Sequence, residues 1–256
     1  PCWGPALRPP PVRSGGVGTT VSFARLVRPA IDRVYVGARW AARARMEAFY
    51  AERGCTLGAE NSFFSGVLAR PMPAEALADG LVYTSGSMDE ELAQGIVVRD
   101  GEGAWHLTDL GRELTLFAQR ATGEAAEELW AMLPGLLPGL SIVPRLADMV
   151  GRVLAHAQAT GGPVFRAMSP PYEPEGASPA LLLVTRLGSL RHHRADAHRA
   201  AWRAAGLTAD EIRALPDGPE RAAIEADTDR RDEPAYAVLT EAERWELLAG
   251  LAALPN

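Results

Sequence analysis

The clearest periodic pattern of apolar and polar residues lies between residues 179 and 205, and it predicts one long helix. Ser178 is a favourable N-cap because its hydroxyl can accept a hydrogen bond from a free backbone N–H of the first turn, and Pro179 suits the first helical position. Gly206 supplies the left-handed residue that commonly ends a helix. At about 100° per residue, one apolar stripe of this helix contains Leu183, Leu187, Leu190, Ala201 and Ala205.

Two polar residues, Arg194 and His198, fall on that same stripe, one turn apart. On the helical wheel Asp196 points the other way, and His192 and His193 lie on the flanks. Burying an arginine or a histidine without a partner costs several kcal/mol, so each group needs a carboxylate, a carbonyl, a water or a ligand. Two interpretations follow: a polar pocket built on Arg194 and His198, or a structural hydrogen-bond network that fixes the helix in a helical core.

Shorter patterns predict further helices and two segments without regular structure. Residues 1–20 are rich in proline and glycine and are predicted to form a flexible leader, and residues 161–178 a Pro-rich connector. The connector would separate an N-terminal half, 21–160, from a C-terminal half, 179–256. Besides the long helix, helices are predicted over residues 29–53, 63–68, 73–81, 124–132, 140–159, 208–215 and 218–229.

Residues 73–120 have the element order of a winged helix-turn-helix. After the helix at 73–81 and a turn at 83–86, Ser87 and Glu90 form a capping-box pattern that opens a second helix. The strand-like residues 96–98, a turn at 100–103 and a return strand at 104–107 then predict a hairpin, and a helix begins at Thr108-Asp109. The phrase W-H-L-T-D-L-G-R-E-L resembles the exit from the hairpin in MarR-like winged-helix proteins.

A weaker copy of this unit is predicted at about 190–250. Leu239-Thr240-Glu241 with Arg244 repeats the spacing of Leu107-Thr108-Asp109 with Arg112, at an offset of 132 residues. We therefore predict an internal duplication in which the second winged helix is degenerate.

The central helix resembles that of a family of uncharacterised actinobacterial proteins described as helix-turn-helix or MarR-like. The similarity covers an HR-x-D-x-H pattern followed by A-A-G-L, and the matching positions here are His193, Arg194, Asp196, His198 and Gly206-Leu207. The resemblance implies a helical, winged-helix fold. In MarR-like regulators a bound small molecule shifts the winged helices, so the resemblance also implies ligand-dependent regulation.

The residues that would read DNA are poorly suited to it. In a winged helix the second helix of the turn motif enters the major groove. Here that helix carries Ser87 and Gln94 but three carboxylates and no basic residue, and each carboxylate would repel phosphate. The wing contributes Arg99 beside two acidic residues. We expect Ser87, Gln94 and Arg99 to form at most a weak DNA-binding surface, and a packing or dimerisation role for the unit is an equal alternative.

Composition supports a globular protein without a dedicated nucleic-acid surface. The chain has 256 residues, 47% of them hydrophobic and 23% charged, with a net charge of −6 and arginine as its only strongly basic residue. No apolar run approaches the roughly 18 residues of a membrane span, and no secretory signal pattern is present. Cys2 and Cys55 lack the spacing of a metal or disulfide framework. We expect a cytoplasmic protein with no membrane partner.

Metal and nucleophile chemistry find less support than ligand binding. His192 and Asp196 have the i, i+4 spacing of a helical metal pair, but Arg191 and Arg194 would oppose a cation and favour an anion. No nucleophile elbow or phosphate-binding glycine motif occurs. An enzyme would depend on His198 as acid or base and on Arg194 as an anion clamp.

We therefore expect a mainly α-helical protein, with one winged helix-turn-helix unit and a degenerate second copy around a long central helix. The favoured function is a MarR-like protein that binds a small ligand and acts in transcriptional regulation, without a cofactor or a metal. Its partners would be the ligand, DNA and a second copy in a homodimer. The alternatives are an enzyme or a metal- or haem-binding protein that uses the central helix, and a structural module that binds a partner. The predicted ligand-binding residues are His193, Arg194, Asp196, His198 and Trp202.

Overall fold

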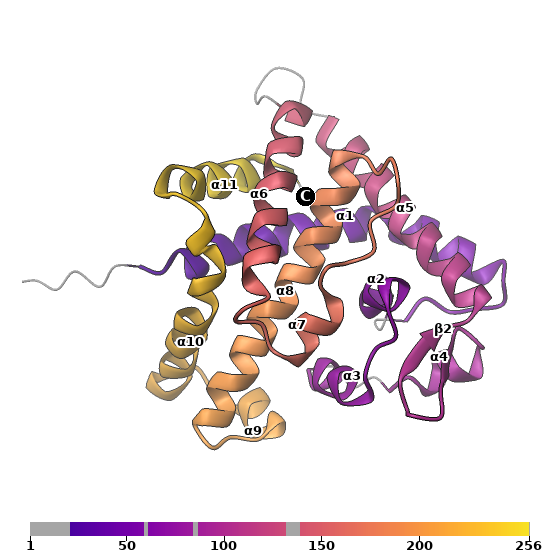
Figure 1. Cartoon of the computed structure of the whole chain (residues 1–256), viewed down its shortest axis with the longest axis horizontal. Helices are drawn as coiled ribbons and strands as arrows, with labels where there is room; N and C mark the ends of the chain where they lie inside the picture. Colours follow the sequence, from indigo (N-terminus) through magenta and orange to yellow (C-terminus); the bar gives the residue numbers. More distant parts are fainter. Residues whose placement is uncertain (1–20, 59–60, 84–86, 132–138, 256) are drawn as a thin grey trace, which may run out of the picture.

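The computed structural model of the chain describes residues 21–58, 61–83, 87–131 and 139–255, and it is mainly helical (Figure 1). The predicted leader at 1–20 and most of the turn at 83–86 lie outside these residues. In the described part of the chain, the elements are α1 (Phe23–Ala51), α2 (Asn61–Ala69), α3 (Ala74–Leu81), α4 (Asp89–Ala93), β1 (Val97–Arg99), β2 (Trp105–Leu107), α5 (Asp109–Ala131), α6 (Gly139–Ala157), α7 (Pro163–Met168), α8 (Pro179–Ala204), α9 (Ala209–Ala214), α10 (Pro219–Asp232), the 3-10 helix η1 (Glu233–Val238) and α11 (Glu241–Ala253).

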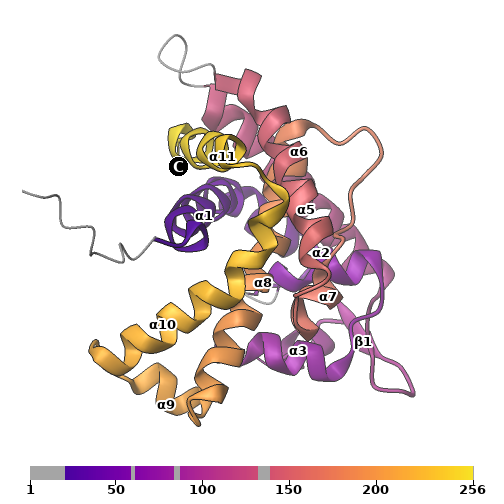
Figure 2. The same ribbon diagram turned by 60° about the vertical axis from the view of Figure 1, so that its left-hand side comes forward.

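Helix α8 passes through the middle of the molecule, as predicted. It packs against α1, α5, α6, α7 and α10, with α3 and the hairpin on one side of it and α10 on the other in both views (Figures 1 and 2). The predicted ends are confirmed: the Ser178 hydroxyl accepts a hydrogen bond from the Leu181 N–H at 3.3 Å, and Gly206 has φ +79°. These local signals set the length of the helix.

The prediction of a single buried stripe on α8 is wrong. Ala205 is exposed, whereas Asp196, expected on the outer side, is buried, and so is Arg199. Because neighbouring helices cover α8 from several directions, buried positions occur around most of its circumference. Polar residues on every side therefore need internal partners.

The two predicted halves share one hydrophobic core. The largest cluster of buried residues draws side chains from α1, α5, α6, α7, α8, η1 and α11. The connector predicted at 161–178 also contributes: its helix α7 buries Phe165 in this cluster, and it buries Val164, Ala167 and Met168 in a second cluster with residues of α2 and α3. The sequence indicated prolines and glycines there, but the apolar residues between them decide the packing.

Residues 73–131 contain the predicted elements in the predicted order. Strands β1 and β2 pair antiparallel, with Val97 opposite Leu107 and Arg99 opposite Trp105. The capping box at Ser87 does not form, because the Ser87 hydroxyl accepts from the Asp89 N–H at 3.3 Å and α4 begins only at Asp89.

Helix α5 is longer than predicted and continues through the segment 124–132, which the sequence suggested was a separate helix. Gly123, in the middle of this helix, is a point of contact with α8. A Cβ at Gly123 would lie 2.8 Å from the Leu181 side chain, so the glycine allows α5 to approach α8 closely.

The predicted second wing is absent. Between residues 190 and 255 the structure has no strand, and η1 occupies the position where a hairpin would follow α10. The two similar segments are both helix N-termini. The Thr108 hydroxyl accepts a hydrogen bond from the Gly111 N–H at 3.0 Å near the start of α5. Thr240 forms a complete capping box with Glu243 at the start of α11. Such a motif recurs wherever a helix needs an N-cap, so it does not by itself indicate duplication.

The carboxylate of Glu243 links this helix start to α6. It accepts hydrogen bonds from the Thr240 N–H and from Arg152, and these donors lower its pKa to about 2. A carboxyl whose pKa falls on folding stabilises the fold above its ordinary pKa of 4.5 and loses that contribution as the pH falls toward 2.

We therefore predict that Glu243→Gln lowers the free energy of unfolding at neutral pH, and that the difference from the wild type shrinks between about pH 4.5 and pH 2. Urea unfolding at pH 7, 4 and 3 measures this. Glu241→Gln, at an exposed position of the same helix, is the matched control and should leave the pH dependence unchanged. A difference that is constant with pH would contradict the assignment.

Candidate functional site

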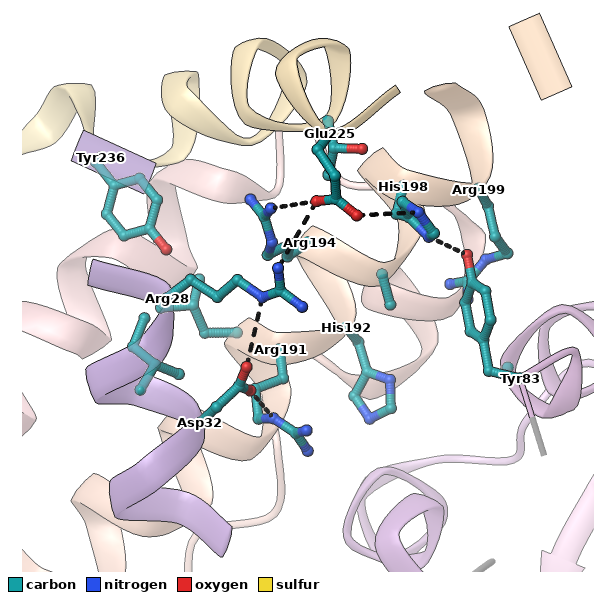
Figure 3. A pocket seen from close by; sticks show the side chains of 15 residues that line it. Arg28, Asp32, Tyr83, Arg191, His192, Arg194, His198, Arg199, Glu225 and Tyr236 are labelled. Carbon is teal, nitrogen blue, oxygen red and sulfur yellow. Dashed lines mark hydrogen bonds and ion pairs between the residues drawn. The ribbon is translucent and has the colours of Figure 1, made fainter. Parts of the chain in front are cut away.

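Arg194 and His198 both line a pocket with a volume of about 330 Å³ (Figure 3). Its walls come from α1, α3, α8, α10 and η1, together with the segment that follows α3. The charged or titratable residues around it are Arg28, Asp32, Tyr83, Arg191, His192, Arg194, His198, Arg199, Glu225 and Tyr236. This volume is at the lower end of the range for small-molecule sites.

The Arg194 side chain is 14% exposed and is held by acidic residues of α10. Its Nη1 atom lies 2.8 Å from Asp229 Oδ1 and 3.6 Å from Asp232 Oδ2, and its Nη2 atom donates to Glu225 Oε2 at 3.3 Å. The guanidinium is therefore paired with three carboxylates of α10 at the pocket wall.

His198 lies between a hydroxyl and a carboxylate. Its Nδ1 atom is 2.8 Å from the Tyr83 hydroxyl, which accepts a hydrogen bond from Trp202 Nε1 at 2.9 Å. The Trp202 indole can only donate, so the Tyr83 oxygen accepts from it. The single proton of the Tyr83 hydroxyl is then available for His198, and the favoured arrangement has this hydroxyl donating to Nδ1. The proton of the neutral ring is then on Nε2, which faces Glu225 Oε1 at 3.6 Å.

The surroundings of His198 and Tyr83 favour the neutral form of each side chain. Burial lowers the pKa of His198, and the negative charge of Glu225 opposes that effect. Burial also raises the pKa of the Tyr83 hydroxyl. Among the residues that the structure describes, none offers a hydrogen-bond partner to His198 Nε2, although this atom is buried.

The rim of the pocket on α1 carries a second ion-pair cluster. Asp32 accepts from Arg191 Nε at 2.7 Å and lies 3.5 Å from Arg28, one turn earlier on the same helix. Arg28 also lies 3.7 Å from Glu225, so it connects the two clusters (Figure 3).

His193, a predicted ligand-binding residue, lies outside the pocket lining. Its Nδ1 atom is 2.7 Å from Asp232 Oδ1 and its Nε2 atom is 3.0 Å from the Thr160 hydroxyl, with the ring edge-on to Phe165. Both nitrogens are thus used inside the core. His192, predicted on a flank of the helix, lines the pocket, and burial lowers its pKa to about 3.

Asp196 and Trp202 also lie behind the pocket surface. The Asp196 carboxylate accepts from the Phe165 N–H at the start of α7 and from Arg199, each at 2.7 Å. Trp202 contributes indirectly through its hydrogen bond to Tyr83. Of the five predicted ligand-binding residues, the structure brings only Arg194 and His198 to the pocket.

The site residues missed from sequence come mostly from other elements. Arg28 and Asp32 have an i, i+4 spacing on α1, which is a usable signal for an ion pair. Tyr83 follows a short helix and Glu225 lies among mixed charges, so neither had a distinguishing pattern.

The predicted DNA-reading residues each make contacts within the protein. The Ser87 hydroxyl donates to Asp89, the Gln94 side-chain oxygen accepts from the Thr56 N–H at 2.5 Å, and Arg99 lies over the Trp105 ring at 5.2 Å. Each of these side chains therefore has a partner within the protein.

The metal-like spacing of His192 and Asp196 does not produce a site, because Asp196 is used at the start of α7. In the described ranges, no group of three or more His, Cys, Asp or Glu side chains is placed to hold a metal ion. None of the helices in those ranges combines the length and the apolar composition needed to cross a membrane.

A scan of protein-family models and searches of curated proteins and of solved structures gave no match to this chain.

Proposed function

We propose that the protein binds a small polar molecule in the pocket between α1, α8 and α10. The observation that carries this proposal is His198 Nε2, a buried donor that faces the cavity and, within the described structure, makes no hydrogen bond. Leaving a buried polar group unsatisfied costs about 1–3 kcal/mol, and a ligand acceptor at this position would recover that energy.

We further propose that residues 73–131 form a winged-helix unit that responds to the ligand. Tyr83 directly follows α3, the first helix of this unit, and its hydroxyl touches His198. Arg203 on α8 pairs with Asp79 on α3 at 2.6 Å, and Arg213 donates to the Val82 carbonyl at 2.8 Å. A ligand that moves His198 would therefore act directly on the position of α3.

A direct reading of DNA has weaker support in this unit. Helix α4, in the place of the recognition helix, has five residues, and Asp89, Glu90 and Glu91 fill its first turn.

An enzyme is the second candidate, and the Tyr83–His198–Glu225 chain favours it. A neutral imidazole between a hydroxyl and a carboxylate is suited to move a proton within the pocket. The two candidates differ in outcome: a binding protein returns its ligand unchanged, whereas an enzyme converts it.

The proposal predicts that a small polar compound raises the melting temperature and that His198→Gln abolishes this shift. A ligand at about 100 times its Kd stabilises the folded state by about 2.7 kcal/mol, which corresponds to roughly 5 °C or more for a chain of this size. A thermal-shift screen of small polar compounds on the wild type and the variant measures this, and mass spectrometry of the recovered compound detects conversion.

His156→Gln is the matched control, because His156 lies exposed on α6 outside the pocket. It should bind and shift like the wild type. Hydrogen exchange should show added protection in α3 on binding. Equal shifts in wild type and His198→Gln would place any binding elsewhere and overturn the proposal.

A further inference from the structure

Glu225, which lines the pocket from α10, is held loosely by three groups. Its Oε2 atom lies 3.3 Å from Arg194 Nη2 and 3.7 Å from Arg28 Nη1, and its Oε1 atom lies 3.6 Å from His198 Nε2 (Figure 3). Well-formed hydrogen bonds between a guanidinium and a carboxylate are about 2.7–2.9 Å long. All three contacts of Glu225 are longer than this.

The other carboxylate that lines the pocket is held more tightly, because Asp32 Oδ1 accepts a hydrogen bond from Arg191 Nε at 2.7 Å. The Glu225 side chain is also 37% exposed. It is thus the one acidic group, among those described around the pocket, that combines loose contacts with a clear path to solvent.

We propose that Glu225 occupies the position of a ligand carboxylate, and that the ligand is a small organic acid whose carboxylate displaces Glu225 from Arg28, Arg194 and His198. This inference rests on the proposed function of the pocket. The two arginines supply donors suited to a carboxylate, and His198 Nε2 supplies the donor that lacks a hydrogen bond. The displaced Glu225 would turn into solvent.

The rest of the lining fits the body of such an acid. Ile31, Leu190 and the rings of Tyr83 and Tyr236 provide apolar wall, and the volume of about 330 Å³ admits a molecule with one ring or a short branched chain. The single negative charge of the ligand carboxylate would replace that of Glu225 beside the two arginines. A phosphate dianion would add a further negative charge close to Asp32, so the site favours a carboxylate over a phosphate.

The proposal is tested by the affinity of phenylacetate for the wild-type protein and for Glu225→Gln. Removing the competing carboxylate while keeping its size should strengthen the binding of phenylacetate about tenfold or more. Phenylacetamide, which has the same ring but no charge, should show no such gain. Isothermal titration calorimetry at pH 7 gives the Kd values, with inorganic phosphate as a third probe.

Glu220→Gln is the matched control, since Glu220 lies exposed on the same helix and outside the pocket. It should bind phenylacetate like the wild type, which separates displacement of Glu225 from a general change in charge. A gain confined to Glu225→Gln and to phenylacetate supports the proposal.

Three outcomes would overturn the proposed displacement of Glu225. None of them decides whether the pocket binds a small polar molecule, which the thermal-shift experiment tests separately. The outcomes are equal or weaker binding of phenylacetate by Glu225→Gln, tighter binding of phosphate than of phenylacetate, and no binding of phenylacetate by any form of the protein. In the last case, a neutral compound whose thermal shift depends on His198 would still support the pocket as a binding site.

Discussion

Replacing Asp196 with alanine is expected to lower the free energy of unfolding by about 3–5 kcal/mol, the usual cost of removing one partner from a buried ion pair. The carboxylate of Asp196 accepts from the Phe165 N–H and from Arg199, and Arg199 is 2% exposed. Without the carboxylate, a buried guanidinium loses its ion-pair partner and the start of α7 loses its cap. Gly162 shows how tightly the site is built, because a Cβ there would lie 2.6 Å from the Asp196 carboxyl carbon.

Urea unfolding at pH 7 measures this loss. Asp210→Ala is the matched control, since the Asp210 side chain is 88% exposed and its ion pair with Arg213 is at the surface; it should change stability by less than about 1 kcal/mol. The double variant Asp196→Ala/Arg199→Met should recover part of the loss by removing the unpaired charge. A loss below about 1 kcal/mol for Asp196→Ala would show that the pair does not support the core.

This residue also shows why part of the structure could not be predicted from the sequence. A helical wheel assigns one buried side to a helix that rests on a core, and on that basis Asp196 belonged to the outer side. Helix α8 is instead covered by α6, α7, α10 and α1, so a residue opposite the apolar stripe meets another helix. The position of Asp196 depends on α7, which the sequence presented as a connector.

The boundaries of elements were more predictable because their causes are local. Ser178 caps α8 and Gly206 follows its end, and the turn at 100–103 joins two short strands as expected. A cap or a tight turn requires only residues a few positions apart. By contrast, the duplication was inferred from a helix-start motif, which carries no information about the hairpin that should precede it.

Only the residues of the candidate site on the central helix could be predicted from the sequence, because their signal is local. Arg194 and His198 stood out because they interrupt an apolar stripe. Their partners lie far away in the sequence: Tyr83 is 115 residues from His198, and Glu225 is 31 residues from Arg194. Pairings over such separations depend on how the helices pack, and a single sequence gives no periodic signal for them.

The second prediction with a large expected effect concerns acid stability and His192. Burial lowers the pKa of its imidazole from the ordinary value of 6.5 to about 3, and the positive charges of Arg191 and Arg199 add to this. The ring lies 5.2 Å from that of Phe63. Between pH 6.5 and pH 3 the unfolded chain takes up a proton at His192 that the folded chain does not. The contribution of the neutral ring is therefore complete above pH 6.5 and is lost as the pH falls.

Replacing His192 with glutamine, which stays neutral at every pH, should remove this acid sensitivity. Relative to the variant, the wild type is expected to lose about 2–4 kcal/mol of unfolding free energy between pH 7 and pH 4, an order-of-magnitude figure at 1.36 kcal/mol per pKa unit. Urea unfolding of both proteins at pH 7, 6, 5 and 4 gives the two curves.

The exposed His156, changed to glutamine, is the control and should follow the wild type. Because other groups, such as Glu243, also contribute to acid sensitivity, the informative quantity is the difference between the wild type and each variant at the same pH. Parallel curves for wild type and His192→Gln would mean that the ring takes up a proton in the folded state as readily as in the unfolded state. The pocket would then gain a positive charge on mild acidification. A wild-type curve that falls more steeply than the His192→Gln curve between pH 7 and pH 4 would instead show that the folded protein keeps the His192 ring neutral.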